Sequence, residues 1–131
     1  MTIVSIDFSI LYPGICISKD FKEFKWIPIV NTRITKKERE NLDCLVELYP
    51  NLSISYTSSK RKTEAEYHLT ERTKLINYQE LIDLIIKEIL EKTDDDNIIC
   101  AIEGISYGSK GNSLVDISQS TGILKIKLMF L

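Results

Sequence analysis

Short apolar runs dominate the beginning of the chain. Three of them are rich in β-branched residues and predict strands, at residues 3–8, 10–17 and 24–30. Pro13 and Gly14 lie inside the second run and are typical of a turn, so we expect a hairpin or a sharp bend there. Pro28 in the third run indicates an edge position or a bulge, because proline cannot donate to a ladder of strand hydrogen bonds.

The spacing of apolar residues then changes to a helical period. It predicts a helix over 35–48, an extended segment over 52–57, a polar exposed connection over 58–72, a long helix over 70–93, a strand over 98–105 and a final helix over 113–131. Asn77 and Glu80 also fit a capping box, so a later start of the long helix is the alternative. Asn112 or Ser113 is the expected N-cap of the final helix.

The order of these elements indicates an α/β or α+β sheet domain. The long helix would be the crossover that a parallel pair of strands requires. The strand at 98–105 is apolar apart from Glu103 and Gly104, which is typical of a strand covered on both faces of a parallel sheet. The chain of 131 residues is expected to form a single domain with its own core.

Composition narrows the function classes. Hydrophobic residues make up 44% of the chain and charged residues 27%, which excludes a disordered tail. The formal net charge of −2 excludes nucleic-acid binding driven by overall positive charge, although a local basic patch stays open. Three cysteines without a CxxC pair indicate buried thiols in a reducing compartment. The chain also lacks a leader pattern and a long apolar run, so we expect a cytoplasmic protein with no membrane partner.

Two carboxylates interrupt the most apolar strands, Asp7 in IVSIDFS and Glu103 in IICAIEGIS. An ionised carboxylate in such a strand is costly unless it is paired, hydrogen-bonded or bound to a metal. If the two strands are neighbours, both side chains lie at the same end of the sheet, where their hard oxygen ligands suit Mg²⁺ or Mn²⁺. The alternative is that Asp7 hydrogen-bonds the turn after its strand and Glu103 simply meets solvent.

Two further segments are candidates for binding an anion or a nucleic acid. The glycine-rich loop YGSKGNS precedes a helix N-terminus and could approach a phosphate through Tyr107, Ser109, Lys110 and Asn112. A basic run consists of Lys60, Arg61 and Lys62. The alternatives are an ordinary strand-to-helix turn and a solvated loop. The single tryptophan, Trp26, and the tyrosines show no regular stacking pattern along the sequence.

These motifs together resemble a known family. The opening VSIDFSILYPGICI resembles the first hairpin of the RNase H-like superfamily, where a strand ends in a metal-binding Asp. The stretch AIEGISYGSKGNSLVDISQSTGILK is similar to RuvC-type Holliday junction resolvases, particularly phage-type relatives. In these, a strand ends in a catalytic Glu, and a loop and a helix with a central Gln and Gly follow, here Gln119 and Gly122. The resemblance covers the first ~20 residues and residues 76–128.

The resemblance implies an RNase H-like mixed sheet, with antiparallel hairpin strands, a parallel central pair and flanking helices. It implies a Mg²⁺- or Mn²⁺-dependent endonuclease that cleaves phosphodiester bonds in branched or duplex DNA, as in Holliday junction resolution. Asp7 and Glu103 would be the catalytic metal ligands. The YGSKGNS loop would contact the DNA backbone. Relatives often form a homodimer through the helix that corresponds to residues 113–131, although core packing explains its apolar stripe equally well.

The family carries its remaining carboxylates on a helix that follows one more strand, and this chain ends at Leu131. We therefore expect an incomplete domain without those C-terminal elements, either a fragment or a truncated relative. The alternative function is an inactive DNA-binding or dimerisation module that keeps the fold. A fragment of an actin-like or sugar-kinase ATPase also begins with such a hairpin, but it needs a second phosphate loop and a longer chain.

Overall fold

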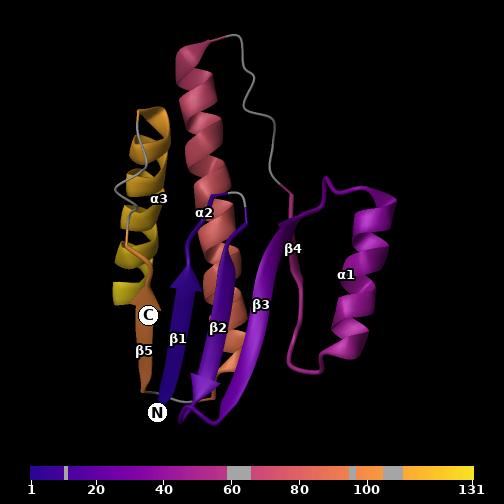
Figure 1. The fold of residues 1–131 in the computed structure, drawn as a ribbon. Coiled ribbons are helices and arrows are strands. Elements are labelled where there is room, and N and C mark those ends of the chain that lie inside the picture. Colours follow the sequence, from indigo (N-terminus) through magenta and orange to yellow (C-terminus); the bar gives the residue numbers. More distant parts are fainter. Residues whose placement is uncertain (11, 59–65, 95–96, 105–110) are drawn as a thin grey trace. The chain divides into compact units, whose positions relative to one another are not determined.

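The computed structural model describes residues 1–10, 12–58, 66–94, 97–104 and 111–131, apart from the side chain of Ser113. In this part the chain has an α/β fold with a five-stranded mixed sheet and three helices (Figure 1). The residues group into two compact units. We call Met1–Ser58 with Ile89–Glu103 the sheet unit, and Ser59–Glu88 with Gly104–Leu131 the helix-pair unit.

The sheet has the strand order β4-β3-β2-β1-β5 (Figure 1). Its strands are β1 (Thr2–Asp7), β2 (Gly14–Lys19), β3 (Glu23–Asn31), β4 (Ser55–Thr57) and β5 (Ile98–Ile102). Antiparallel pairing joins β1 to β2 and β2 to β3, whereas β5 runs parallel to β1 and β4 parallel to β3. The predicted hairpin at Pro13-Gly14 and the predicted parallel pair are therefore confirmed.

Burial alternates along the three antiparallel strands, as expected for a sheet with one covered face. The side chains of the covered face are buried, and they are Val4, Ile6, Ile15, Ile17, Ile27 and Ile29. The opposite face is here called the open face, and it bears Ser5, Asp7, Cys16, Trp26 and Pro28. Strand register places Ser5, Cys16 and Trp26 in one row across this face.

Pro28 does not lie on an edge strand, as its residue type had indicated, because β3 has neighbours on both sides. The N–H groups of Trp26 and Thr32 both donate toward the β4 side, to Asn51 and Thr57, so the nitrogen of Pro28 faces the same side. Pairing on that side consists of a bridge at Trp26 and a ladder that begins at Ile29. Pro28 falls between them, where no donor is needed.

The prediction that the strand over 98–105 is covered on both faces is wrong for its described residues. Within the described chain, β5 is an edge strand whose one neighbour is β1. Ile99 is 52% exposed, and Cys100 and Ala101 are exposed as well. Cys44 is also exposed and Cys16 half-buried, so the cysteines are free thiols as expected but not buried ones.

Helix α1 (Lys36–Leu48) begins where the sequence predicts, and a capping box fixes its start. The Thr35 hydroxyl accepts a hydrogen bond from the Glu38 N–H, and the Glu38 carboxylate accepts one from the Thr35 N–H. This exposed contact lowers the pKa of Glu38, chiefly through the backbone hydrogen bond. The Arg39 guanidinium lies 4.2 Å from the centre of the Tyr56 ring, which connects α1 to β4.

Helix α2 (Tyr67–Lys92) begins earlier than predicted, so the residues from Tyr67 onward are helical rather than an exposed connection. The alternative start at Asn77 is wrong, because Asn77 is a buried residue in the middle of the helix. Helix α3 (Asn112–Met129) agrees with its predicted range, but its N-cap is Gly111 and no side chain caps it. Gly111 adopts a φ of 62°, a conformation that glycine tolerates better than Asn or Ser.

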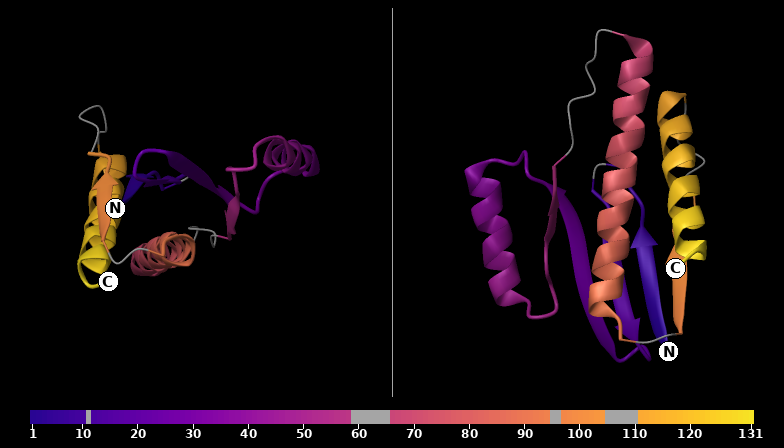
Figure 2. Two further views of the ribbon diagram at one scale, coloured as in Figure 1. Left: turned by 90° about the horizontal axis from the view of Figure 1, so that it is seen from below. Right: turned by 180° about the vertical axis from the view of Figure 1, so that it is seen from behind.

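In the helix-pair unit, α2 and α3 run side by side in the same direction (Figure 2). Lys74 contacts Asp116 near the beginning of both helices, and Asp83 contacts Lys127 further along both. Buried residues of this unit include Tyr78, Ile82, Ile85, Ser120 and Leu124. Within the part of the chain that the structure describes, none of the helices combines the length and apolarity needed to cross a membrane.

Candidate functional site

Asp7 and Glu103 lie together at one end of the sheet, as the sequence predicted for neighbouring strands. Asp7 is the last residue of β1, and Glu103 directly follows β5. The parallel register pairs Ile6 with Ile102, and the Glu103 N–H donates a 3.0 Å hydrogen bond to the Ile6 carbonyl oxygen. The two acids therefore occupy the next position of the same ladder and share the open face.

Contact with Asp7 changes the electrostatics of Glu103. A hydrogen bond with Asp7 is the main cause that raises the pKa of Glu103, and repulsion from the Asp7 charge adds to it. Both residues are exposed, so water screens part of this repulsion. When the Glu103 carboxyl is protonated, it donates a hydrogen bond to a carboxyl oxygen of Asp7. Glu103 also meets solvent, as the alternative expected, but its carboxyl interacts with Asp7 as well.

The donor chemistry of this pair fits a hard divalent cation. Two adjacent carboxylates offer anionic oxygen ligands, which Mg²⁺ and Mn²⁺ prefer, and a cation between them would relieve their mutual repulsion. Among the described residues, however, no group of three or more His, Cys, Asp or Glu side chains is placed to hold a metal. Among the described residues, Asp7 and Glu103 are thus the two carboxylates that meet at this end of the sheet.

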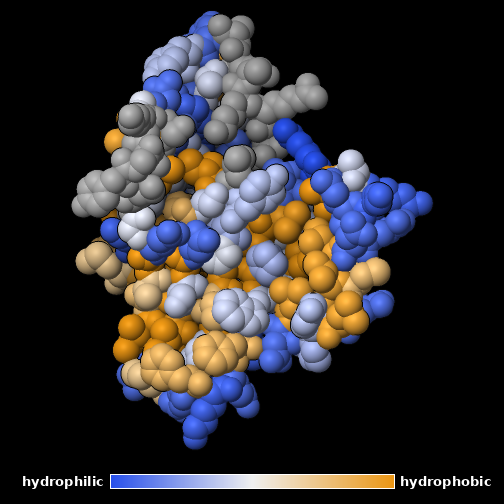
Figure 3. All heavy atoms as spheres, in the orientation of Figure 1, coloured by the Kyte–Doolittle hydropathy of each residue, from blue (hydrophilic) through white to orange (hydrophobic). Residues whose placement is uncertain are grey.

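A hollow of about 430 Å³ adjoins Asp7 on the open face of the sheet unit. It is lined by Ser5, Asp7, Gly14, Ile15, Cys16, Trp26, Ile27, Pro28 and Leu52. The volume is within the usual range for a small-molecule site, and the lining is mostly apolar with one acid at its margin. Figure 3 shows apolar side chains, in orange, gathered over β3 and β4 toward α1. Asp7 belongs both to the lining of the hollow and to the acid pair, so the two adjoin at this residue.

Sequence reasoning missed the aromatic part of this site. The rings of Phe24 and Trp26 are stacked, with centroids 6.3 Å apart and planes inclined by 16°. They belong to alternate residues of β3 and so project from the same face of the strand. The sequence did contain a signal for this pair, since Phe24 and Trp26 are two residues apart in a predicted strand. Only the neighbouring strands of the sheet show that the face bearing both rings is open.

The other predicted site residues do not join this group in the described structure. Tyr107, Ser109 and Lys110 lie outside the described residues, and so do Lys60, Arg61 and Lys62. Asn112 is the first residue of α3, is exposed, and belongs to the helix-pair unit. The phosphate-contacting loop and the basic run therefore stay predictions.

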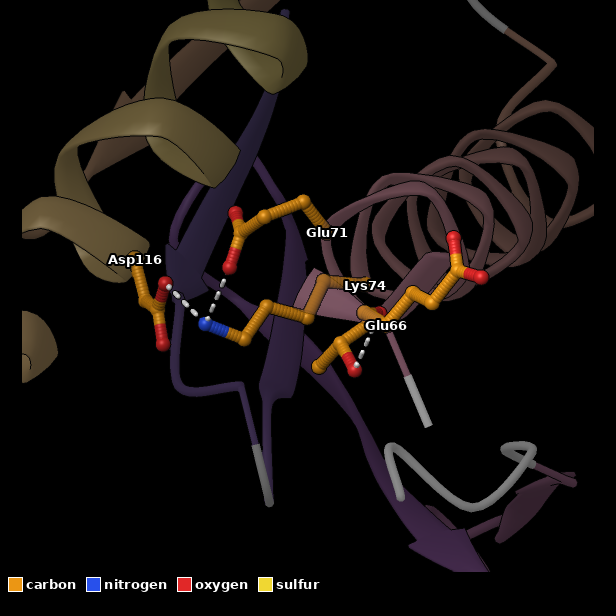
Figure 4. A network of polar contacts seen from close by, with 5 residues as sticks. Glu66, Glu71, Lys74 and Asp116 are labelled. Carbon is orange, nitrogen blue, oxygen red and sulfur yellow. Dashed lines mark hydrogen bonds and ion pairs between the residues drawn. The ribbon is translucent and has the colours of Figure 1, made fainter. Parts of the chain in front are cut away.

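A second cluster of carboxylates lies in the helix-pair unit (Figure 4). The Lys74 ammonium is 3.0 Å from a Glu71 oxygen and 3.3 Å from an Asp116 oxygen. These contacts, led by the hydrogen bond to Glu71, raise the pKa of Lys74. Tyr78 is buried, and its burial together with the negative charge of Asp116 raises its pKa to about 12. One lysine pairs with both acids here, so this cluster is a structural ion-pair network.

The chain was also compared with known proteins. No family model, curated protein or solved structure matches it significantly. The geometry of the acid pair and of the adjoining hollow is therefore the feature that bears on function.

Proposed function

We propose that this protein is a divalent-metal-dependent endonuclease of the RNase H-like, RuvC type that acts on branched DNA. The carrying observation is the direct contact of Asp7 and Glu103 at the ends of two parallel, paired strands. The order of elements around it adds support, since an antiparallel β1–β2–β3 sheet followed later by a parallel strand agrees with the resemblance in the sequence.

The chemistry follows from the residues present. A divalent cation held by these residues would supply positive charge to a phosphodiester and would help to activate water. The Asp7 and Glu103 carboxylates would both hold the cation. Glu103, at the exposed edge strand, would also accept a hydrogen bond from a water molecule and orient it toward the phosphate. The exposed position of both acids leaves room for a large substrate such as DNA.

The test is cleavage of a labelled four-way DNA junction by the purified chain, with Mg²⁺, with Mn²⁺ and with a chelator. We expect cleavage only when a metal is present. Asp7→Asn and Glu103→Gln should each slow it by at least about 100-fold, because each removes a ligand that acts on the reacting phosphate. Asp43→Asn is the matched control, because it removes an exposed acid on α1 and should leave the rate unchanged.

If the chain does not cleave the junction with either metal, the proposal is overturned, whether or not the junction is bound. Cleavage that is unaffected by Asp7→Asn would also overturn it, because the activity would then come from another site or from a contaminant. A fully paired duplex of the same length, run beside the junction, shows whether branching is recognised.

A second candidate function is a DNA-binding or dimerisation module that keeps the fold without catalysis. It is favoured by the grouping of two carboxylates, rather than three, among the described residues. The same assay separates the two candidates. Junction binding without cleavage in either metal, unchanged in Asp7→Asn, would favour the module over the nuclease.

A further inference from the structure

The larger hollow beside Asp7 has a second, smaller neighbour within the sheet unit. The smaller one, of about 290 Å³, is lined by Trp26, Tyr49, Pro50, Asn51 and Leu52. Trp26 and Leu52 line both hollows and so form the ridge between them. Trp26 is 53% exposed, although tryptophan is usually well buried. An exposed tryptophan between two hollows offers an apolar surface for a ligand.

Small residues create the larger hollow. Ser5, Gly14 and Cys16 come from neighbouring strands and lie in its lining, where bulkier side chains would fill the space. A Cβ atom built on Gly14 would meet no other atom within 4 Å. The backbone of Gly14 is ordinary strand rather than left-handed, so the turn does not require glycine at this position. The main effect of having no side chain at Gly14 is therefore that the space of the hollow stays unfilled.

The stacking of Phe24 on Trp26 prepares the indole for binding. Phe24 is itself only 39% exposed, and its ring lies nearly parallel to that of Trp26. A ring that is already supported on one side loses less rotational freedom when a second flat group binds against it. A planar aromatic ligand therefore fits this surface better than a branched aliphatic one.

We propose that the larger hollow binds one unpaired nucleobase against Trp26, from the nucleotide whose phosphate lies at the Asp7–Glu103 pair. This inference rests on the proposed nuclease function and names what that site recognises. Asp7 belongs both to the acid pair and to the lining of the hollow. A ligand that fills both parts needs a flat ring joined to an anionic group that a divalent cation can bridge to the acids. A nucleotide has both.

The same geometry disfavours a protein partner on this surface. A second copy of the chain laid over the open face would bury the Asp7 and Glu103 carboxylates, at a high cost in desolvation. A standard protein interface also needs roughly 800 Å² from each partner, which is more than a hollow of this kind provides. A single base leaves the acids open to water and to a cation.

The absence of basic side chains from the described lining of the hollows predicts how base binding at Trp26 responds to salt. Among the described residues that line the two hollows, none is a lysine or an arginine. The contribution of Trp26 to binding should therefore be nearly independent of salt, whereas contacts to phosphates weaken steeply as salt rises.

The experiment uses the fact that Trp26 is the only tryptophan in the chain. Its fluorescence is followed while the full chain is titrated with a duplex that carries one unpaired thymidine, and with the same duplex fully paired. Ca²⁺ replaces Mg²⁺ to limit cleavage. We expect quenching and tighter binding with the unpaired base. Trp26→Ala should weaken the binding of that duplex about 5- to 150-fold, the range for the loss of one stacked base.

Three further variants make the result specific, with their binding followed by anisotropy of labelled DNA. Trp26→Phe keeps a ring and should retain most of the affinity, which separates stacking from general damage. Gly14→Leu should fill the hollow and weaken binding while Trp26 stays in place. Phe21→Ala removes a ring that is 65% exposed and does not line either hollow, and it should change nothing. Circular dichroism confirms that each variant is folded.

Equal affinity for the paired and unpaired duplexes would overturn the inference, and so would unchanged binding by Trp26→Ala. A change in Trp26 fluorescence on dilution without DNA would assign the hollow to a second copy of the chain and would also overturn it. The proposed nuclease function fails separately. Quenching without any metal-dependent cleavage would leave base binding in place, and cleavage without quenching would leave only the nuclease.

Discussion

The two clusters of carboxylates use the same residue types in opposite ways. In the sheet unit, Asp7 and Glu103 contact each other, and this raises the pKa of a carboxyl group. In the helix-pair unit, Lys74 lies between Glu71 and Asp116, and the raised pKa is that of the amine. The second cluster contains its own cation, whereas the first would be balanced by a cation from solution. Acids that repel one another are therefore the better candidates for function.

The largest expected difference between the clusters is their response to Mg²⁺. A metal that binds the native state at 100 times its Kd stabilises it by about 2.7 kcal/mol. We expect a gain of this order in the intact chain, none in Asp7→Asn, and the full gain in Asp116→Asn. Thermal unfolding with and without Mg²⁺ measures it. A gain that survives in Asp7→Asn would place the metal elsewhere.

The lysine of the second cluster should have a smaller effect on stability. Lys74→Met leaves Glu71 and Asp116 without their shared cation, and we expect a loss of about 1 kcal/mol in the free energy of unfolding. Lys36→Met is the matched control, because Lys36 forms an exposed ion pair with Glu40 at 3.9 Å. Its loss should be a few tenths of a kcal/mol. Equal losses in urea unfolding would contradict a structural role for Lys74.

The smallest expected effect is a change in melting temperature. It is also the sharpest test, because removing one carboxylate should change the melting temperature in opposite directions in the two clusters. Without metal, Glu103→Gln removes repulsion from Asp7 and should slightly raise the melting temperature. Glu71→Gln removes an attraction to Lys74 and should slightly lower it. Both changes should shrink at high salt, where surface charges are screened. A lower melting temperature for Glu103→Gln would show that its carboxylate already has a compensating partner.

Much of the fold could be predicted because its signals are local. Pro13 and Gly14 marked the hairpin, and the spacing of apolar residues marked the helix that became α1. The pairing of the two acids was also predictable, because each ends an apolar strand and a helix between the strands allows parallel pairing.

Other features depended on neighbours that are distant in the sequence. The apolar run of β5 suggested cover on both faces, yet Ile99 is exposed because β5 is an edge strand of the described sheet. The face of Trp26 could be read from its strand, but its exposure depends on the small side chains of β1 and β2 beside it. Lys74 and Asp116 are 42 residues apart, and only the packing of two helices brings them together.

The sequence by itself determined where strands and helices form and which two acids end adjacent strands, because backbone propensity and hydrophobic period act over a few residues. Only the tertiary structure decided which charges are compensated. Coulomb energy depends on distances between side chains from different elements, and these exist only once the chain has folded. For the same reason, the hollow beside Asp7 exists only when the strands β1, β2 and β3 are in register, because it is lined by residues from all three.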